Sequence, residues 1–176
     1  MAGNMLAAYV PSAITMVINH PASNTTHVLG GFSSDSVVSI EYPDETWTET
    51  VGTDGRTTRT HRLDKTLRVT VHLDQTSISN DVLSALMKYD ENDLTGVGGI
   101  FTCTLADKSG RSYAYSSQCY VKRPQSQEFG SAVSTRDWVV VMAWADQNIG
   151  GGGKIDQDTV AVLEAFGITI DDTWKI

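Results

Sequence analysis

Residues 66–73 read TLRVTVHL, and this strict alternation of polar and apolar side chains predicts a β-strand with one dry face. One side of the pleat carries Leu67, Val69, Val71 and Leu73, and the other carries Thr66, Arg68, Thr70 and His72. Such a pattern is typical of an antiparallel sheet that packs one face on a core and leaves the other face in water. The stretch therefore predicts a sheet over an apolar core.

Further strand patterns occur at residues 13–20, 36–42, 99–107, 111–123 and 136–146. Residues 107–110 separate two of these strands, which are expected to form a hairpin in which Gly110 can take a positive φ. Segment 136–146 is apolar on both faces, so it predicts a central strand with Trp138 and Trp144 in the core. Runs of strands with few helices predict a mainly β fold of seven or eight antiparallel strands, a sandwich or a partly closed barrel.

Two segments carry a helical pattern instead. In residues 76–93, Ser77 or Ser79 can cap the first backbone N–H groups, and the apolar stripe consists of Ile78, Val82, Leu83, Leu86 and Met87. Residues 150–153 are four glycines and are expected to be a flexible joint. After them, residues 156–166 predict a short helix with Val160, Leu163 and Phe166 as its apolar stripe. The predicted organisation is a β domain at 1–153 with one flanking α-helix, and a helical C-terminal extension at 154–176.

The composition argues against several classes of function. The chain has 176 residues, a net charge of −8 and a pI near 4.8. Tight DNA binding depends on Lys and Arg at the phosphates, so this acidic chain is not expected to hold DNA. It contains no apolar run of about 20 residues, the length of a membrane helix, and its first residues lack the features of a signal peptide. We therefore expect a soluble protein made in a cytoplasm.

Residues that often carry chemistry form no recognisable constellation. His20, His27, His61 and His72 lack metal-ligand spacing and are predicted to lie at the surface. Cys103 and Cys119 are interpreted as apolar strand residues rather than as a disulfide or a metal site. Acidic clusters occur at Asp44/Glu45, Asp90/Glu91/Asp93 and Asp171/Asp172, where solvation in loops and at helix ends is the ordinary explanation. The sequence therefore predicts no enzyme, catalytic residue, cofactor or metal.

Residues 46–62 read TWTETVGTDGRTTRTHR, with seven threonines and with Trp47 and Val51 as the two large apolar side chains. The turn at 52–55 predicts a long hairpin. An isolated two-stranded ribbon is marginal in water, so a partner must hold it. Its acids Glu45 and Glu49 and its bases Arg56, Arg59 and Arg62 suit a polar contact. We interpret the hairpin as an arm that binds another copy of the chain, with a mobile surface loop as the alternative.

Five segments in this order and spacing resemble the tail tube proteins of contractile-tailed bacteriophages, which are similar in fold to the tube protein of the type VI secretion system. They are GTDGRTTRT (52–60), LDQTSISNDVLSAL (73–86), QCYVKRPQSQEFG (118–130), RDWVVVMAW (136–144) and NIGG (148–151). The resemblance covers approximately residues 30–151, and LDQTSISNDVLSAL is its most specific part. It implies a β-sandwich or barrel with one flanking helix.

The resemblance also implies hexameric rings that stack into a hollow tube inside a contractile sheath, through which DNA passes without specific binding. The resemblance implies that the protein is a component of the phage virion and is assembled in the host cytoplasm. Its partners would be the tail sheath, tape measure protein, baseplate and tail terminator. The inter-ring contact would involve Trp47, Glu49, Val51, Thr53, Asp54, Arg56 and Arg59. Candidates for the lumen wall, on the solvent side of their strands, are Ser39, Glu41, Arg68 and Thr70.

One segment departs from the resemblance, and two other functions stay open. Residues 154–176 match no part of the family pattern, and residues 1–12 are interpreted as an arm that becomes ordered on assembly. The main alternative is a secreted tube-like protein or a carbohydrate-binding β-sandwich. Its candidate sugar-stacking aromatics are Tyr113, Tyr115, Trp138 and Trp144. A hydrolase that uses scattered acids ranks last.

Overall fold

The computed structural model describes residues 9–21 and 23–176, so most of the predicted N-terminal arm lies outside the described residues. The strands are β1 (Ile14–His20), β2 (Thr25–Val28), β3 (Val38–Glu41), β4 (Trp47–Val51), β5 (Thr57–His61), β6 (Leu67–Asp74), β7 (Phe101–Asp107), β8 (Tyr113–Lys122), β9 (Thr135–Ala143) and β10 (Asp146–Asn148). The α-helices are α1 (Ser79–Asn92) and α2 (Gln157–Ala165), and short 3-10 helices lie at Pro11–Ala13 and Asp172–Trp174.

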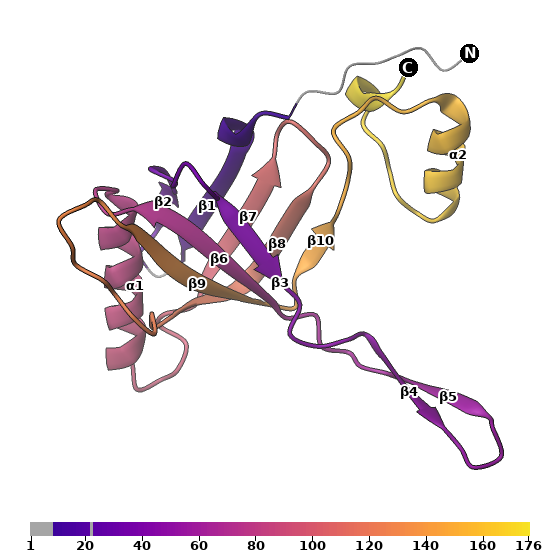
Figure 1. Ribbon diagram of the computed structural model, residues 1–176, viewed down its shortest axis with the longest axis horizontal. Helices are drawn as coiled ribbons and strands as arrows, with labels where there is room; N and C mark the ends of the chain where they lie inside the picture. The colour runs from indigo at the N-terminus through magenta and orange to yellow at the C-terminus, as the bar shows by residue number, and fades with distance from the viewer. Residues whose placement is uncertain (1–8, 22) are drawn as a thin grey trace.

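A single antiparallel sheet forms the body, in the order β2-β1-β7-β8-β9-β6-β3 with β10 paired to β8. The sheet curls so that β3, β6 and β9 cross over β1, β7 and β8 (Figure 1). This mainly β, sandwich-like fold confirms the predicted class. Strands β2 and β10 were not predicted, because they are short edge strands without an alternating pattern of burial.

The core lies between the two halves of this curled sheet. Every apolar residue that the TLRVTVHL pattern places inward is buried, and the inward side chains of β9 meet them across the β6–β9 ladder. Cys103 and Cys119 are buried here as free thiols, in agreement with their interpretation as apolar strand residues. Hydrogen bonding to Cys119 and burial raise the pKa of Cys103, so that thiol stays protonated.

Helix α1 closes one end of the core. Leu83 is fully buried, and Leu86 and Met87 pack against the core beside it. Neither Ser77 nor Ser79 is the N-cap of α1, which is Ile78 and makes no side-chain cap bond. The Ser77 hydroxyl nevertheless accepts the backbone N–H of Ser79, the first helical residue, at 3.2 Å. Ile78 was wrongly placed in the apolar stripe, because it is the N-cap before the first residue of α1 and the Ile78 side chain is exposed.

Two further expectations on the strands are wrong. Trp144 is exposed rather than in the core, because β9 ends at Ala143 and a φ of 50° at Trp144 breaks the alternation. The turn after β7 does not use a positive φ at Gly110. The Asp107 carboxylate holds that turn instead, since it accepts the backbone N–H of Ser109 at 2.8 Å and its hydroxyl at 2.6 Å.

His20 is buried, contrary to the predicted surface position. It ends β1 on the same inward face as Ile18, so the alternation of the strand carries it under α1. Its Nε2 lies 2.7 Å from the carbonyl oxygen of Gly98, and its Nδ1 lies 2.9 Å from Ser23 Oγ. The imidazole is therefore satisfied as a structural group of the core.

The C-terminal extension has a small apolar cluster of its own. Val160 of α2 is buried there, and the other members are Ile155, Leu163, Ile170 and Trp174. Phe166 does not join this cluster as predicted, because it lies beyond the last helical turn and is exposed. The glycines before the extension are also held rather than free, since Ser112 Oγ donates to the Gly150 carbonyl at 2.8 Å and Arg111 donates to the Gly153 carbonyl.

We expect Leu83→Ala to lower the free energy of unfolding by about 2–5 kcal/mol, because it opens a cavity at a fully buried site. Ile78→Ala is the matched control on the same segment, and its effect should stay within about 0.5 kcal/mol. Urea titration followed by circular dichroism measures both changes. If Leu83→Ala were as stable as the wild type, another face of the helix would pack against the sheet.

Candidate assembly surfaces

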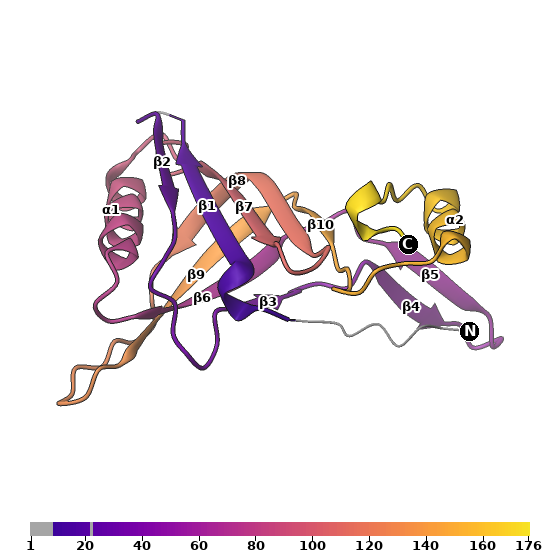
Figure 2. The same cartoon turned by 90° about the horizontal axis from the view of Figure 1, so that it is seen from above.

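The β4–β5 hairpin projects from the body as an arm (Figures 1 and 2). Its two strands pair only with each other among the described residues. The predicted turn is confirmed: Gly55 has a φ of 77°, and the Gly52 N–H donates to the Arg56 carbonyl at 2.8 Å. At its base, Arg62 forms an ion pair with Asp44 at 2.5 Å, which ties the two ends of the arm together.

The arm has two chemically different faces, because side chains alternate along each strand. One face, the threonine face, consists of the cross-strand pairs Thr48–Thr60 and Thr50–Thr58. The other, the mixed face, consists of the pairs Trp47–His61, Glu49–Arg59 and Val51–Thr57. The abundance of threonine is evident from the sequence, whereas this separation depends on the register of the hairpin.

The mixed face is partly covered by its own side chains. The Arg59 guanidinium lies 4.4 Å from the centroid of the Trp47 ring, and the His61 ring centroid lies 4.6 Å from the same indole. Trp47 and Val51 nevertheless remain exposed. The arm therefore presents apolar and uncharged polar surface that no described part of its own chain buries.

Each predicted inter-ring residue lies on this arm. Trp47, Glu49, Val51 and Arg59 lie on the mixed face, and Thr53, Asp54 and Arg56 form the tip. Arg56 Nε is 3.5 Å from the Asp54 carboxylate, so the tip carries an exposed ion pair. The structure thus brings all seven residues into one projecting element.

The four predicted lumen residues lie together on the outer face of β3 and β6. Ser39 pairs with Thr70 and Glu41 with Arg68 across the ladder, and the Arg68 and Glu41 side chains approach to 4.0 Å. Glu41, Arg68 and Thr70 also line a polar cavity of about 630 Å³ beneath the connection between β8 and β9. This outer face is therefore a continuous polar surface.

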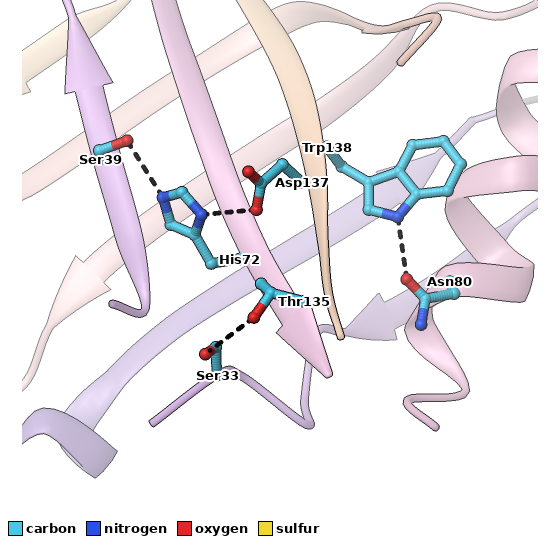
Figure 3. Close-up of polar contacts among 7 residues, drawn as sticks. All are labelled: Ser33, Ser39, His72, Asn80, Thr135, Asp137 and Trp138. Atoms are coloured by element: carbon cyan, nitrogen blue, oxygen red, sulfur yellow. Dashed lines mark hydrogen bonds and ion pairs between the residues drawn. The ribbon is translucent and has the colours of Figure 1, made fainter. Parts of the chain in front are cut away.

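A hydrogen-bonded row that the sequence analysis missed crosses the same face (Figure 3). His72 Nδ1 lies 2.7 Å from Asp137 Oδ1, and His72 Nε2 lies 3.4 Å from Ser39 Oγ. The row joins β3, β6 and β9, three neighbouring strands from distant parts of the chain. Ser39 is exposed on an edge strand, and its contact with His72 is long for a hydrogen bond. We interpret the row as a lateral tie between strands.

The family model for the Bacteriophage PhiTE tail tube protein matches residues 6–150. The chain belongs to this tail tube family. The structural protein ORF10 of Pseudomonas phage KPP10 is 40% identical over 174 residues, which cover 99% of each chain. The predicted resemblance to phage tail tube proteins is thereby confirmed, and the protein is a structural component of the virion rather than an enzyme. The family match ends before the C-terminal extension, whereas the KPP10 relative spans it.

Two acids of the Asp90/Glu91/Asp93 cluster in this tail tube protein have structural partners. Hydrogen bonds from the Thr95 hydroxyl and from the Gly98 N–H lower the pKa of Asp93 to about 2. The Glu91 carboxylate pairs with Arg123 at 2.7 Å. Within residues 9–21 and 23–176, no group of three His, Cys, Asp or Glu side chains is placed to hold a metal ion. In the same part of the chain, no helix has the length and apolarity to span a membrane.

We expect Asp93→Asn to destabilise the subunit at neutral pH, because the Asp93 carboxylate accepts N–H groups that hold the loop after α1. Since the folded pKa is lowered, the stabilisation is present above the usual value of 3.8 and is lost as the pH falls through about 2. Urea titrations between pH 7 and pH 2 should show the two proteins converging in acid. Asp35→Asn, at an exposed aspartate before β3, is the control and should show no such convergence.

Proposed function

We propose that copies of this chain close into hexameric rings and that the rings stack into the hollow tail tube through which phage DNA is ejected. The observation that carries the proposal is the projecting β4–β5 arm, which exposes Trp47, Val51 and a threonine face. A two-stranded ribbon with no covering layer gains little stability from its own contacts. In the tube, a neighbouring subunit supplies that layer.

The arm contacts the adjacent ring through Trp47, Glu49, Val51, Thr53, Asp54, Arg56 and Arg59. Such a contact is heterologous, because an arm at one end of a subunit meets a different surface on the next subunit. A heterologous contact that does not close on itself adds rings without limit, so it produces a filament. The geometry of a one-ended arm supports this mode of growth.

The lumen wall includes Ser39, Glu41, Arg68 and Thr70, on the polar outer face of β3 and β6. Their setting is polar but not basic, since Arg68 faces Glu41 and the whole chain carries a net charge of −8. A wall without an excess of basic side chains offers the phosphates few counter-charges, which disfavours adhesion of DNA. DNA therefore passes without specific binding.

The tube is assembled in the host cytoplasm and works with other tail components. A contractile sheath surrounds it, a tape measure protein occupies it during assembly, and a baseplate and a tail terminator meet its two ends. Residues 1–153 form the tube domain, and residues 154–176 form an extension outside it. The separate apolar cluster of the extension supports this division.

We expect deletion of Val51–Arg56 to leave a folded subunit that forms no tubes, because the tip of the arm is lost while the core is untouched. A finer pair of variants is Val51→Asp on the arm and Val162→Asp on α2, both at exposed valines. Only the first should prevent stacking. Negative-stain electron microscopy over a range of concentration and salt measures the outcome, and normal tubes from the deletion variant would contradict the role of the arm.

One observation favours the alternative of a carbohydrate-binding module: Tyr113, Tyr115 and Tyr120 form an exposed stripe along β8. Trp138 does not contribute, since it is buried and its indole N–H donates to Asn80 Oδ1 at 2.9 Å (Figure 3). We expect no change of melting temperature on addition of mono- or oligosaccharides. A rise that grows with sugar concentration would favour the alternative, because a ligand that binds only the folded state stabilises it.

A further inference from the structure

The tip of the β4–β5 arm carries Asp54 followed by Gly55, the one place in the chain where glycine follows Asp or Asn. Because glycine has no Cβ, its backbone nitrogen can approach the carboxyl carbon of the preceding aspartate closely. Both residues are exposed, and the Asp54 side chain is 60% accessible to solvent. A Cβ placed on Gly55 would meet no heavy atom within 4 Å beyond its chain neighbours, so the space around this residue is open.

The turn holds the Asp54 carboxyl against the backbone that follows it. Asp54 Oδ1 accepts the backbone N–H of Arg56 at 3.2 Å, and Arg56 Nε lies 3.5 Å from Asp54 Oδ2. The ring that the first hydrogen bond closes includes the Gly55 nitrogen. The carboxyl carbon of Asp54 and the next backbone nitrogen are therefore kept close together, which favours a reaction between them.

Two hydrogen bonds of the tip oppose such a reaction. The Gly55 N–H donates to the Gly52 carbonyl at 2.9 Å, and the Gly52 N–H donates to the Arg56 carbonyl at 2.8 Å. The first of these must break before the Gly55 nitrogen can attack. Exposed hydrogen bonds in a segment with few buried contacts open at low cost, and no residue of β4 or β5 is buried. The tip therefore opens readily in a free subunit.

We propose that Asp54 and Gly55 are a site of spontaneous modification, at which free subunits convert Asp54 to isoaspartate through a cyclic imide. The Gly55 nitrogen attacks the side-chain carboxyl carbon of Asp54, so that a C–N bond forms and one carboxyl oxygen leaves as water. That water takes the N–H hydrogen and the proton of the acid. Solvent water then opens the five-membered ring at the main-chain carbonyl of Asp54, which leaves Gly55 joined to the former side chain. The two steps release and consume one water and change no oxidation state.

Isoaspartate lengthens the backbone of the tip by one methylene. The extra group lies between Gly52 and Arg56, whose hydrogen bond closes the turn, so the modified tip takes a different path. The chemical step does not depend on the proposed tube, whereas its effect on assembly rests on it, because Thr53, Asp54 and Arg56 are the tip residues of the inter-ring contact. Modified subunits are therefore excluded from tubes. Subunits already in a tube keep aspartate, since a neighbour that covers the tip suppresses its opening.

Peptide mapping of aged protein tests the site. Free subunits and tubes from fresh protein are incubated in parallel for weeks at neutral pH and then digested. Isoaspartate is detected by an isoaspartyl methyltransferase and by a shifted elution of the peptide at unchanged mass. We expect isoaspartate at Asp54 to accumulate at least fivefold faster in free subunits than in tubes. Asp35 is the control within the same digest, since it is exposed but precedes Ser36 rather than glycine, and it should react at least threefold more slowly.

Two variants change the chemistry at the same position. Asp54→Glu keeps the charge but would need a six-membered ring, so the imide should form at least tenfold more slowly. Asp54→Asn should react at least tenfold faster in the free subunit, because an uncharged amide resists attack less than a carboxylate and ammonia leaves instead of water. Equal rates in all three proteins, or at Asp54 and Asp35, would overturn the site.

Assembly of aged subunits separates this inference from the proposed tube. Tubes grown from a partly modified sample should be at least fivefold depleted in isoaspartate relative to the subunits left in solution. Equal amounts in both fractions would overturn the effect on assembly. Tubes from fresh protein, with no isoaspartate in aged subunits, would overturn the inference and leave the proposed tube standing. Isoaspartate without tubes would do the reverse, and the absence of both would overturn the two proposals together.

Discussion

The register between β6 and β9 is the constraint on which the rest of the subunit depends. It sets Val69 opposite Val140 and Val71 opposite Trp138, so that the inward side chains of both strands fill one core. A slip by one residue would turn every one of these side chains toward water. The same register places His72 opposite Asp137 on the outer face and aims Trp138 at Asn80 of α1. Core, polar face and helix attachment therefore follow from one ladder.

The β4–β5 arm has the same antiparallel strand geometry as the body but lacks a buried face. In the body, each strand gains stability by burying one face. In β4 and β5 neither face is buried, so local cohesion comes from the backbone ladder, the Trp47–Arg59 contact and the Arg62–Asp44 pair. Segments with few buried apolar contacts open at low cost, so the arm belongs to the least stable part of the subunit. A stable body can carry such an element, and a partner that covers it supplies the missing burial.

The C-terminal extension stands apart from the tail tube core in both sequence and packing. The family match covers residues 6–150, while the extension closes its own cluster around Val160 and meets the body through Arg111, whose guanidinium lies 5.1 Å from the centroid of the Trp174 ring. The KPP10 relative matches along the extension too. The family match therefore stops before this segment, which adds a further surface beside β10.

The sequence by itself determined the strands with strict alternation, the two helices, the turn of the arm and the family, because each depends on local period or on a short motif. The sequence-based predictions are wrong where tertiary context overrides the local pattern. Trp144 is exposed because its own backbone is left-handed, Phe166 is exposed because it lies beyond the last helical turn, and His20 is buried because it lies on the inward face of β1. Only the tertiary structure decided the register that separates the threonine face of the arm from its mixed face, and the Ser39–His72–Asp137 row. The row joins residues distant in the chain, and the pairing of β3, β6 and β9 that joins them is set by burial across the whole sheet.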